Sequence, residues 1–377
     1  MRTQELDFPL PAHLIAQQPV EPRDACRLLH LRKDGVTAHH VFRELPTLLH
    51  PGDLLVLNDS RVLPARVQAR KPSGGAVELL FLRPEGVQAE VTSRREPTRG
   101  ESNREESVQG ERWEALARPS HRLRAGLSLL VGSDELVLEA RLGEGRWIIA
   151  GAPGRSLVSL MEEHGKMPLP PYIREQPADP SSYQTVYAAV PGSAAAPTAG
   201  LHFTPRLLEE LAQSGVEVAY VTLHVGLDTF QPIREEVVEQ HRIHREAYSV
   251  PAVTLAAVQR ARREGRRVVA VGTTVTRVLE TLAQQKLLHK SGDLAGFTDI
   301  FITPGYRFRV VDALLTNFHL PRSTVLALVM AFAGMQRIRE AYAVAVANEY
   351  RFFSFGDAML IDKPAADADR RNEEALP

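Results

Sequence analysis

The 377 residues are 44% hydrophobic and 24% charged, so the chain can bury a sizeable core, should divide into about two domains, and is not a disordered protein. A formal net charge of −1 excludes a global positive field, so any contact with nucleic acid must come from a local basic face. The single cysteine, Cys26, excludes an intramolecular disulfide and a multi-thiolate zinc site, and fits a reducing compartment.

The beginning of the sequence does not have the pattern of a signal peptide. Residues 1–14 are acidic and interrupted by prolines, where a signal peptide has a basic end followed by an apolar run. The longest apolar run, Val325 to Ala333, is much shorter than the ~20 residues that cross a bilayer. We therefore expect a cytoplasmic protein with no membrane role.

Residues 52–70, GDLLVLNDSRVLPARVQAR, predict an elbow between two regions, because a β-rich run is followed by a polar corner, a proline and an alternating run. From there to about residue 154 the chain offers short strand candidates separated by Gly, Ser or Asp, namely AVELLFL, VQAEV, RWEALAR, LSLLV, ELVLEARL and RWIIA. Strands without intervening helices predict a small closed or nearly closed β unit.

A charged segment interrupts this β unit. Thr92 to Arg112 carries five arginines and five glutamates, with Val108 as its one strongly apolar residue, which predicts an extended surface loop. Its arginines suit RNA, but the equal number of glutamates favours a plain solvated insertion.

After Pro153 helices and strands alternate, which predicts a layered α/β region. The periodicity and the caps predict helices over 205–214, 254–264, 273–285 and 321–334, the last entered through Pro321 near its first turn. Strands are predicted over 217–226, 266–272 and 299–302, the last of these being the apolar run DIFI.

Several segments of this region offer groups for chemistry. The corner Gly272-Thr273-Thr274 opens a helix after a β-branched strand, so it can hold an anion or simply cap the helix, and Arg277 lies one turn further. Small residues from Ala195 to Gly200 bring His202 before another helix, where it can transfer a proton or be structural. His224 ends a strand, where α/β sheets usually present ligand groups, and His319 also precedes a helix.

Two other interpretations involve histidines and arginines. His241 and His244 can share a helix face and bind a metal with His202, His224 or His319, but no thiolate or HExxH pattern supports this. The densest basic cluster, Arg260 to Arg267, either meets tRNA phosphates or offsets the dipole at a helix end, and we weigh the two equally.

Taken together, long strings in this chain resemble the S-adenosylmethionine:tRNA ribosyltransferase-isomerase family of queuosine biosynthesis. The resemblance runs from Asp7 to about Ile361 and is carried by DFPLPAHLIAQQPVEPRDACRLL, GDLLVLNDSRVLPARV, YQTVYA, AAPTAGLHFT, VTLHVG, VAVGTT, TDIFITPGYRFRVVDALLTNFHLPRSTVLALVMAFAG and YRFFSFGDAMLI. The chain departs from the family pattern at Leu227 and Asp228, at Arg245, and at Val275-Thr276.

The resemblance implies a reaction and its partners. The ribosyl part of S-adenosylmethionine would be transferred to 7-aminomethyl-7-deazaguanine at the tRNA wobble position and isomerised, giving epoxyqueuosine-tRNA, adenine and methionine. The donor is consumed as a co-substrate, so we expect no cofactor and no metal, and we expect a monomer. It also implies an α/β fold, with a larger layered α/β domain (1–65 and 155–377) interrupted by a small β-barrel (66–154), and the anticodon arm in the cleft between them.

That chemistry needs a base beside the sulfonium and an acid or hydrogen-bond donor for the leaving adenine. It also needs polar groups that bind the ribose hydroxyls and the methionine carboxylate of S-adenosylmethionine. Our hypothesis gives proton transfer to His202 and His224, with Asp59 as the reserve base. The substrate-binding candidates are Asn58, Arg61, Thr198, Gly200, Gly272, Thr273, Thr274, Arg277, Tyr306, Arg307, Asn317 and His319. A metal-dependent hydrolase and a pure RNA-binding module remain as alternatives.

Overall fold

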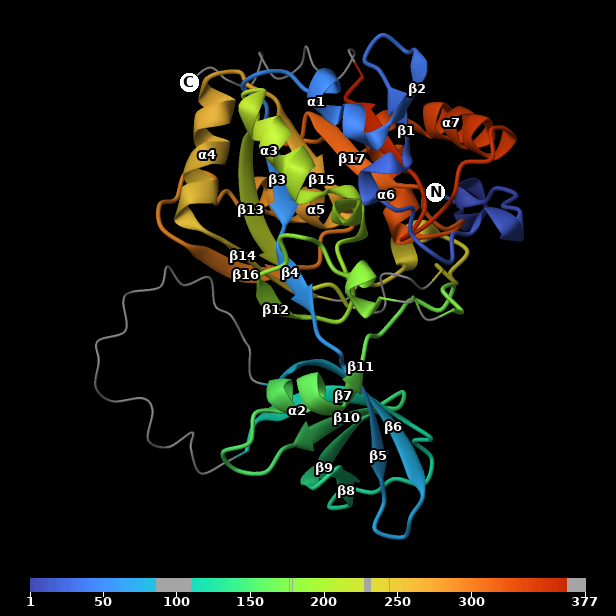
Figure 1. Cartoon of the computed structure of the whole chain (residues 1–377), viewed down its shortest axis with the longest axis vertical. Helices are drawn as coiled ribbons and strands as arrows, with labels where there is room; N and C mark the ends of the chain where they lie inside the picture. Colours follow the sequence, from blue (N-terminus) through green and yellow to red (C-terminus); the bar gives the residue numbers. More distant parts are fainter. Residues whose placement is uncertain (86–109, 176, 178, 227–231, 244, 365–377) are drawn as a thin grey trace.

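A computed structural model describes residues 1–85, 110–175, 177, 179–226, 232–243 and 245–364. The chain forms two units stacked along the long axis of the molecule, a large layered unit and a small barrel (Figure 1). Most of the predicted charged loop, and the residues Leu227, Asp228 and His244, lie outside the described residues. No helix in the described part of the chain is long and apolar enough to cross a membrane.

The large unit is built on one mixed sheet with the order β16-β14-β13-β3-β15-β17-β18-β1-β2. Its central strands are fully buried, as expected of β-branched runs covered on both faces. Strands β13, β3, β15 and β17 run parallel to one another. The strands are β1 Arg27–Leu31, β2 Thr37–Val41, β3 Leu54–Asn58, β13 Glu217–Leu223, β14 Glu246–Val250, β15 Val268–Val271, β16 Leu294–Thr298, β17 Ala313–Asn317 and β18 Ala358–Asp362.

Helices cover this sheet and begin where the sequence provides caps. The Thr204 hydroxyl accepts from the Leu207 amide at 3.2 Å, and the Ser323 hydroxyl accepts from the Leu326 amide at 3.2 Å. The α-helices of this unit are α1 Leu45–Leu48, α3 Pro205–Gln213, α4 Ala252–Arg263, α5 Gly272–Gln284, α6 Thr324–Ala333 and α7 Met335–Ala347. Short 3-10 turns occupy Thr3–Leu6, Ala12–Leu14, Arg23–Ala25, Phe42–Glu44, Pro180–Tyr183, Thr198–His202 and Val238–Gln240.

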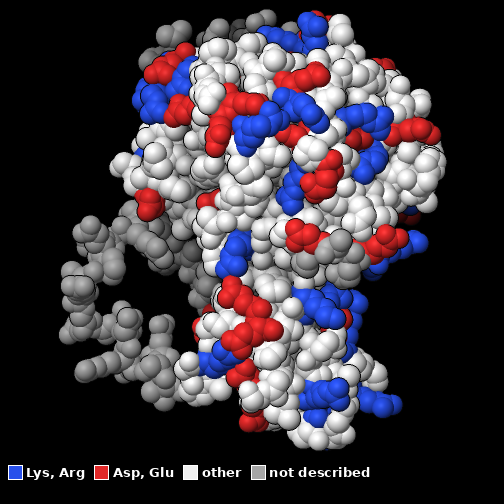
Figure 2. Space-filling model, in the orientation of Figure 1, with Lys and Arg blue, Asp and Glu red and all other residues white. Residues whose placement is uncertain are grey.

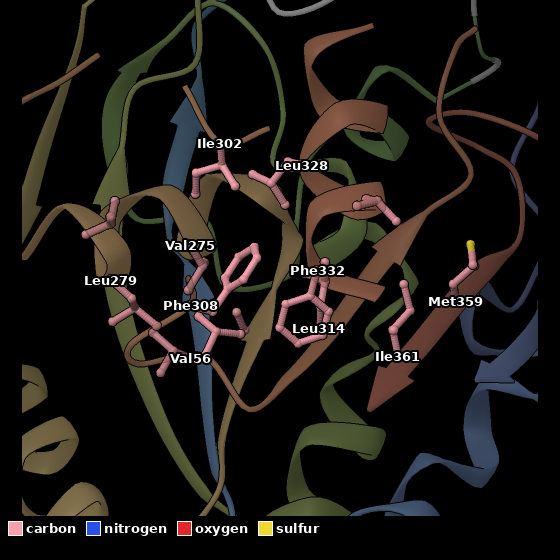
Figure 3. Close-up of a cluster of buried hydrophobic side chains, with 14 of the residues drawn as sticks. Val56, Val275, Leu279, Ile302, Phe308, Leu314, Leu328, Phe332, Met359 and Ile361 are labelled. Atoms are coloured by element: carbon pink, nitrogen blue, oxygen red, sulfur yellow. The ribbon is translucent and has the colours of Figure 1, made fainter. Parts of the chain in front are cut away.

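The main core lies between the sheet and helices α5 and α6. Figure 3 shows Val56 and Leu314 from strands against Val275 of α5 and Phe332 of α6, and all four are buried. Each such side chain contributes roughly 1.5–3 kcal/mol when it leaves water. The layers that carry the site are therefore held rigidly.

The small unit is a closed antiparallel barrel with the strand order β5-β6-β7-β10-β9-β8. It closes because β8 pairs back with β5, at Leu130 and Arg70. Tightly packed side chains such as Trp147 and Phe81 fill its interior. The strands are β5 Arg66–Arg70, β6 Ala76–Pro84, β7 Arg112–Arg118, β8 Ser128–Val131, β9 Asp134–Gly143 and β10 Arg146–Ala150.

The barrel unit continues past residue 154, where we expected it to end. Helix α2, Leu157–His164, places Leu157, Leu160 and Met161 in the barrel core, and β11, Gly165–Lys166, pairs with β5. A short amphipathic helix does not reveal from sequence which core it covers. The two units are joined by β4, Ser60–Val62, and β12, Val190–Ser193, which pair in parallel.

Two local predictions are wrong. Residues 299–302 are not a strand, since the edge strand β16 ends at Thr298 and the next residues have no regular secondary structure, with the Ile300 amide donating to the Thr298 hydroxyl at 3.3 Å. Ile300 and Ile302 are nevertheless buried, which explains the apolar run. Helix α6 is not entered through Pro321, because Ser323 caps it and its first residue is Thr324.

Candidate active site

The carboxyl ends of the central strands face the barrel across a large cleft. The arrowhead of β3 points toward the barrel in Figure 1, and β13 and β15 run parallel to β3. The cleft has a volume of about 1620 Å³ and is lined by both units, with Trp113 and Ile148 on the barrel side and His224 and Thr274 on the sheet side. Open α/β sheets place their ligands at this edge.

His224 follows directly after β13 and lines the cleft. Its backbone amide donates to the Ala247 carbonyl at 3.0 Å, and its ring packs against Gly192, where an added Cβ would lie 2.9 Å from the imidazole. Its Nδ1 is buried and has no hydrogen-bond partner in the part of the chain that the structure describes. Burial lowers the pKa of His224, so the ring is neutral at neutral pH.

Asn58, at the end of β3, fixes the strand end that carries His224. Its Nδ2 donates to the Leu223 carbonyl at 3.0 Å, and its Oδ1 accepts from the Leu223 amide at 3.0 Å. The same Nδ2 also contacts the Thr274 hydroxyl at 3.4 Å. Asn58 is buried and lines neither cavity, which favours a role in positioning His224 and Thr274, and its contact with a substrate stays a prediction.

A smaller cavity of about 60 Å³ adjoins the cleft, and Thr273 and Thr274 line both. Gly272 begins α5 with φ +89°, a conformation that glycine adopts without strain. The cavity collects six predicted binding residues, Thr198, Gly272, Thr273, Thr274, Asn317 and His319. Aromatic rings complete its wall, among them Tyr172 and Phe353. The pKa of His319 is lowered to about 3 by burial, so its ring is neutral.

His202 lies behind this wall and does not line either cavity. Its Nε2 accepts from the Asn317 amide at 3.1 Å, and its Nδ1 contacts the Cys26 thiol at 3.2 Å. Burial lowers the pKa of His202 to about 3. The ring therefore stays neutral and holds the Asn317 side chain, whose Oδ1 contacts the Thr198 hydroxyl at 3.4 Å. This position favours support of Asn317 over direct proton transfer, which remains a prediction.

Arg277 lies one turn into α5 and is 9% exposed. Its Nη1 is ion-paired with Glu246 at the start of β14, and its Nε contacts the Ile300 carbonyl at 3.4 Å. Its Nη2 is buried without a partner among the described residues, and both Arg277 and Glu246 line the cleft. A buried guanidinium with one free donor is prepared for an anionic ligand.

The other predicted site residues line neither cavity. Asp59 accepts from the Thr222 hydroxyl at 2.6 Å, and partial burial raises its pKa. Arg61 pairs with Glu162 of α2 at 2.9 Å and so ties the two units together. The remaining three are Gly200, which packs closely on Tyr187, Tyr306, whose hydroxyl donates to Glu280 at 3.1 Å, and its neighbour Arg307.

The basic cluster of residues 260–267 lies at the opposite edge of the sheet. Arg266 pairs with Glu217, the first residue of β13, at 3.0 Å, and Arg267 pairs with Asp53, just before β3, at 2.5 Å. These ion pairs favour a structural role for the cluster over a contact with tRNA in the cleft. Among the described residues the one group with metal-ligand geometry is Asp134, Glu163 and His164 on the barrel, which is not the histidine set that we considered.

Sequence reasoning missed several cleft residues. Glu246 follows the predicted His244 position in sequence, but nothing local signals that it meets Arg277. The barrel also contributes charged residues to the cleft that we did not single out from the sequence, namely Arg83, Glu85, Arg112, Glu114, Arg118, Glu144 and Arg146.

Comparisons with known proteins identify relatives over nearly the whole chain. A family profile described as "Queuosine biosynthesis protein" matches residues 3–361. An S-adenosylmethionine:tRNA ribosyltransferase-isomerase of Rubrobacter xylanophilus is 54% identical over 96% of this chain and 98% of its own length. One from Moorella thermoacetica is 49% identical over 96% of this chain and its full length. The crystal structure of an S-adenosylmethionine tRNA ribosyltransferase from Thermotoga maritima has a TM-score of 0.52 and 40% identity, covering 95% of this chain and 99% of the other.

Proposed function

Because the chain belongs to the queuosine biosynthesis family and is an enzyme of the transferase and isomerase class, we propose a specific reaction for it. The enzyme transfers the ribosyl moiety of S-adenosylmethionine to 7-aminomethyl-7-deazaguanine at the wobble position of tRNA and isomerises it. The products are epoxyqueuosine-tRNA, adenine and methionine. S-adenosylmethionine is consumed as a co-substrate, and no metal or cofactor takes part.

One observation carries the proposal beyond family membership. Three segments far apart in the sequence, at Ala196–Ala199, His224 and Gly272–Arg277, converge on two adjoining cavities at one edge of the sheet. The barrel closes the other side of the larger cavity with apolar side chains such as Leu82, Leu116 and Ile148. This arrangement supports a partly dry site in which a reactive sulfonium is protected from water.

Polar groups at the two cavities are suited to the methionine carboxylate and to the adenosyl part of S-adenosylmethionine. The Nη2 of Arg277, which has no hydrogen-bond partner among the described residues, is suited to bind the methionine carboxylate through a charge-assisted hydrogen bond. Thr273 and Thr274 line both cavities, and we expect their hydroxyls to contact the ribose. Thr198, Asn317 and His319 then face the adenosyl part, and the neutral His319 ring can hydrogen-bond to it without adding charge.

His224 is the proposed base. The positive sulfur acidifies the C–H bonds of the carbon beside it. A neutral imidazole can accept the proton from that carbon, and the positive sulfur stabilises the resulting ylide. A neutral ring also avoids placing a second cation next to the sulfonium, and burial keeps His224 neutral. Asp59 stays the reserve base, although its carboxylate is engaged by Thr222.

The pH dependence of the reaction follows from the pKa of His224. Because burial lowers that pKa below its ordinary value of 6.5, the ring stays unprotonated as the pH falls toward 6.5. We expect kcat/KM to be flat from pH 8 down to 6.5 and to fall only at lower pH. A steady-state pH profile with saturating tRNA checks this, and an acid limb centred above pH 6.5 would contradict the assignment of His224 as the base.

Release of adenine tests the whole proposal. Protein purified without chelator is incubated with S-adenosylmethionine and tRNA that carries 7-aminomethyl-7-deazaguanine, and adenine is quantified by chromatography. We expect adenine, methionine and modified tRNA in equal amounts, and none with tRNA that carries unmodified guanine. A pure RNA-binding module would release no adenine. Stoichiometric zinc or manganese in the same protein, without adenine release, would support the metal-dependent hydrolase instead.

A further inference from the structure

The described lining of the cleft has more basic than acidic side chains, whereas both kinds are spread over the face of the molecule drawn in Figure 2. Among the described residues that line the cleft, seven are arginines and four are glutamates, while the net charge of the chain is −1. S-adenosylmethionine itself carries a net positive charge, so this surplus does not serve the donor. The cleft volume of about 1620 Å³ also exceeds the roughly 300–1000 Å³ typical of small-molecule sites. The size of the cleft indicates a second occupant besides S-adenosylmethionine, and the surplus of arginines indicates that this occupant is an anion.

Three charged side chains on the barrel side of the cleft offer a binding site for this anion. Glu114 of β7 is 5% exposed and is shared by two arginines, Arg83 of β6 and Arg146 of β10. Arg83 Nη2 lies 2.8 Å from Glu114 Oε2, and Arg146 Nη1 lies 3.2 Å from Glu114 Oε1. We call Arg83, Glu114 and Arg146 the arginine bracket. It is carried by three adjacent strands of a rigid barrel.

Strand geometry turns the bracket toward the cleft. A register shift between Phe81 and Arg83 places Arg83 opposite Glu114, while Phe81 still points into the barrel core. β-Bulges of this kind re-aim a side chain at functional surfaces. All three bracket residues line the cleft.

The arginine bracket has a net positive charge, which distinguishes it from an ordinary structural ion pair. Two guanidiniums share one carboxylate, and Arg146 Nε is buried without a partner among the described residues. At the far edge of the sheet, two other arginines also share one glutamate, but there a second glutamate restores neutrality, in the group Arg260, Arg266, Glu217 and Glu264. The surplus positive charge lies at the surface of the cleft, with the Arg83 side chain 54% and the Arg146 side chain 31% exposed, so an anion in the cleft can reach both guanidiniums.

We propose that the arginine bracket binds a backbone phosphate of the tRNA and so fixes the anticodon arm in the cleft opposite His224. This inference rests on the proposed function, since it takes tRNA as the substrate. A planar guanidinium matches the bidentate geometry of a phosphate group, and the bracket holds two guanidiniums, one on each oxygen of Glu114. A phosphate contact fixes the position of the RNA without reading its sequence, whereas the modified base is recognised at the sheet edge.

Substitution of one bracket arginine tests the proposal. For Arg146→Gln we expect a roughly tenfold rise in the dissociation constant for tRNA, because a charge-assisted contact is lost. The slope of log affinity against log salt should fall by about 0.7–0.9, the value for one phosphate. KM for S-adenosylmethionine should stay at the wild-type value. Arg83→Gln should behave in the same way, and it guards against a folding defect specific to one variant.

Arg260→Gln is the matched control, because it also removes one arginine from a pair that shares a glutamate, at the edge of the sheet away from the cleft. It should leave tRNA affinity and salt slope unchanged. If the Arg146→Gln and Arg83→Gln variants matched the wild type in tRNA affinity and in salt slope, the phosphate site would be overturned. The proposed function would still stand if the wild type released adenine. A wild-type protein that neither binds tRNA nor releases adenine would instead overturn the proposed function.

Discussion

Replacing His224 by alanine is expected to lower kcat for adenine release by roughly 10²–10⁴-fold, the contribution typical of a positioned general base. The imidazole is a half-buried, neutral group beside the cleft, and its buried Nδ1 has no partner among the residues that the structure describes, so its removal takes away the proton acceptor without breaking a described network. Single-turnover adenine release with saturating substrates measures the effect directly, since it isolates the chemical step from product release.

Two further variants make this result specific. His224→Gln keeps a polar side chain of similar size but cannot accept a proton at neutral pH, so it should be as slow as His224→Ala. His289→Ala removes a histidine from an exposed turn after α5 and should keep the wild-type rate. If His224→Gln retained wild-type kcat, His224 would serve as a packing or hydrogen-bonding residue and the base would have to be sought elsewhere, with Asp59 the next candidate.

The regular elements of the fold were largely predictable because their signals are local. Thr204 and the periodic run after it predict α3, and Gly272-Thr273-Thr274 marks the start of α5 to within one residue. Closely spaced strands without helices predicted the closed barrel. The apolar run at residues 299–302 misled us because Ile300 and Ile302 are buried in an irregular segment, and burial gives a short run the same composition as a strand.

The candidate site was predictable as a set of segments but not as a set of contacts. The chain places His202 before a helix, as expected, but its ring turns toward Cys26 and Asn317 because all three are buried together. Glu246 and Arg277 meet from two elements that lie 31 residues apart. The bracket on the barrel needs three strands in register, including one shift. Such contacts depend on the tertiary structure, which no local pattern encodes.

Arg277→Met is expected to damage both stability and donor binding, and the two effects can be separated. The substitution removes the Arg277 guanidinium from its ion pair with the buried Glu246 carboxylate, which should lower the free energy of unfolding by roughly 3–5 kcal/mol. It also removes the guanidinium proposed to hold the methionine carboxylate, so KM for S-adenosylmethionine should rise at least tenfold, as for other charge-assisted contacts. Denaturant unfolding and steady-state kinetics measure the two quantities.

The double variant Arg277→Met with Glu246→Gln separates the two roles of Arg277, which are to balance the charge of Glu246 and to bind the methionine carboxylate. Replacing the Glu246 carboxylate by a neutral amide should recover most of the lost unfolding free energy, because the charge that Arg277 offset is then gone. The glutamine can still accept from the Gly226 amide, which lies 2.8 Å from Glu246 Oε1 in the wild type. The raised KM should persist, since no group is left to meet the donor's carboxylate. A double variant with both stability and KM restored would show that Arg277 only balances Glu246, and the anionic end of S-adenosylmethionine would then have to bind at another group in the cleft.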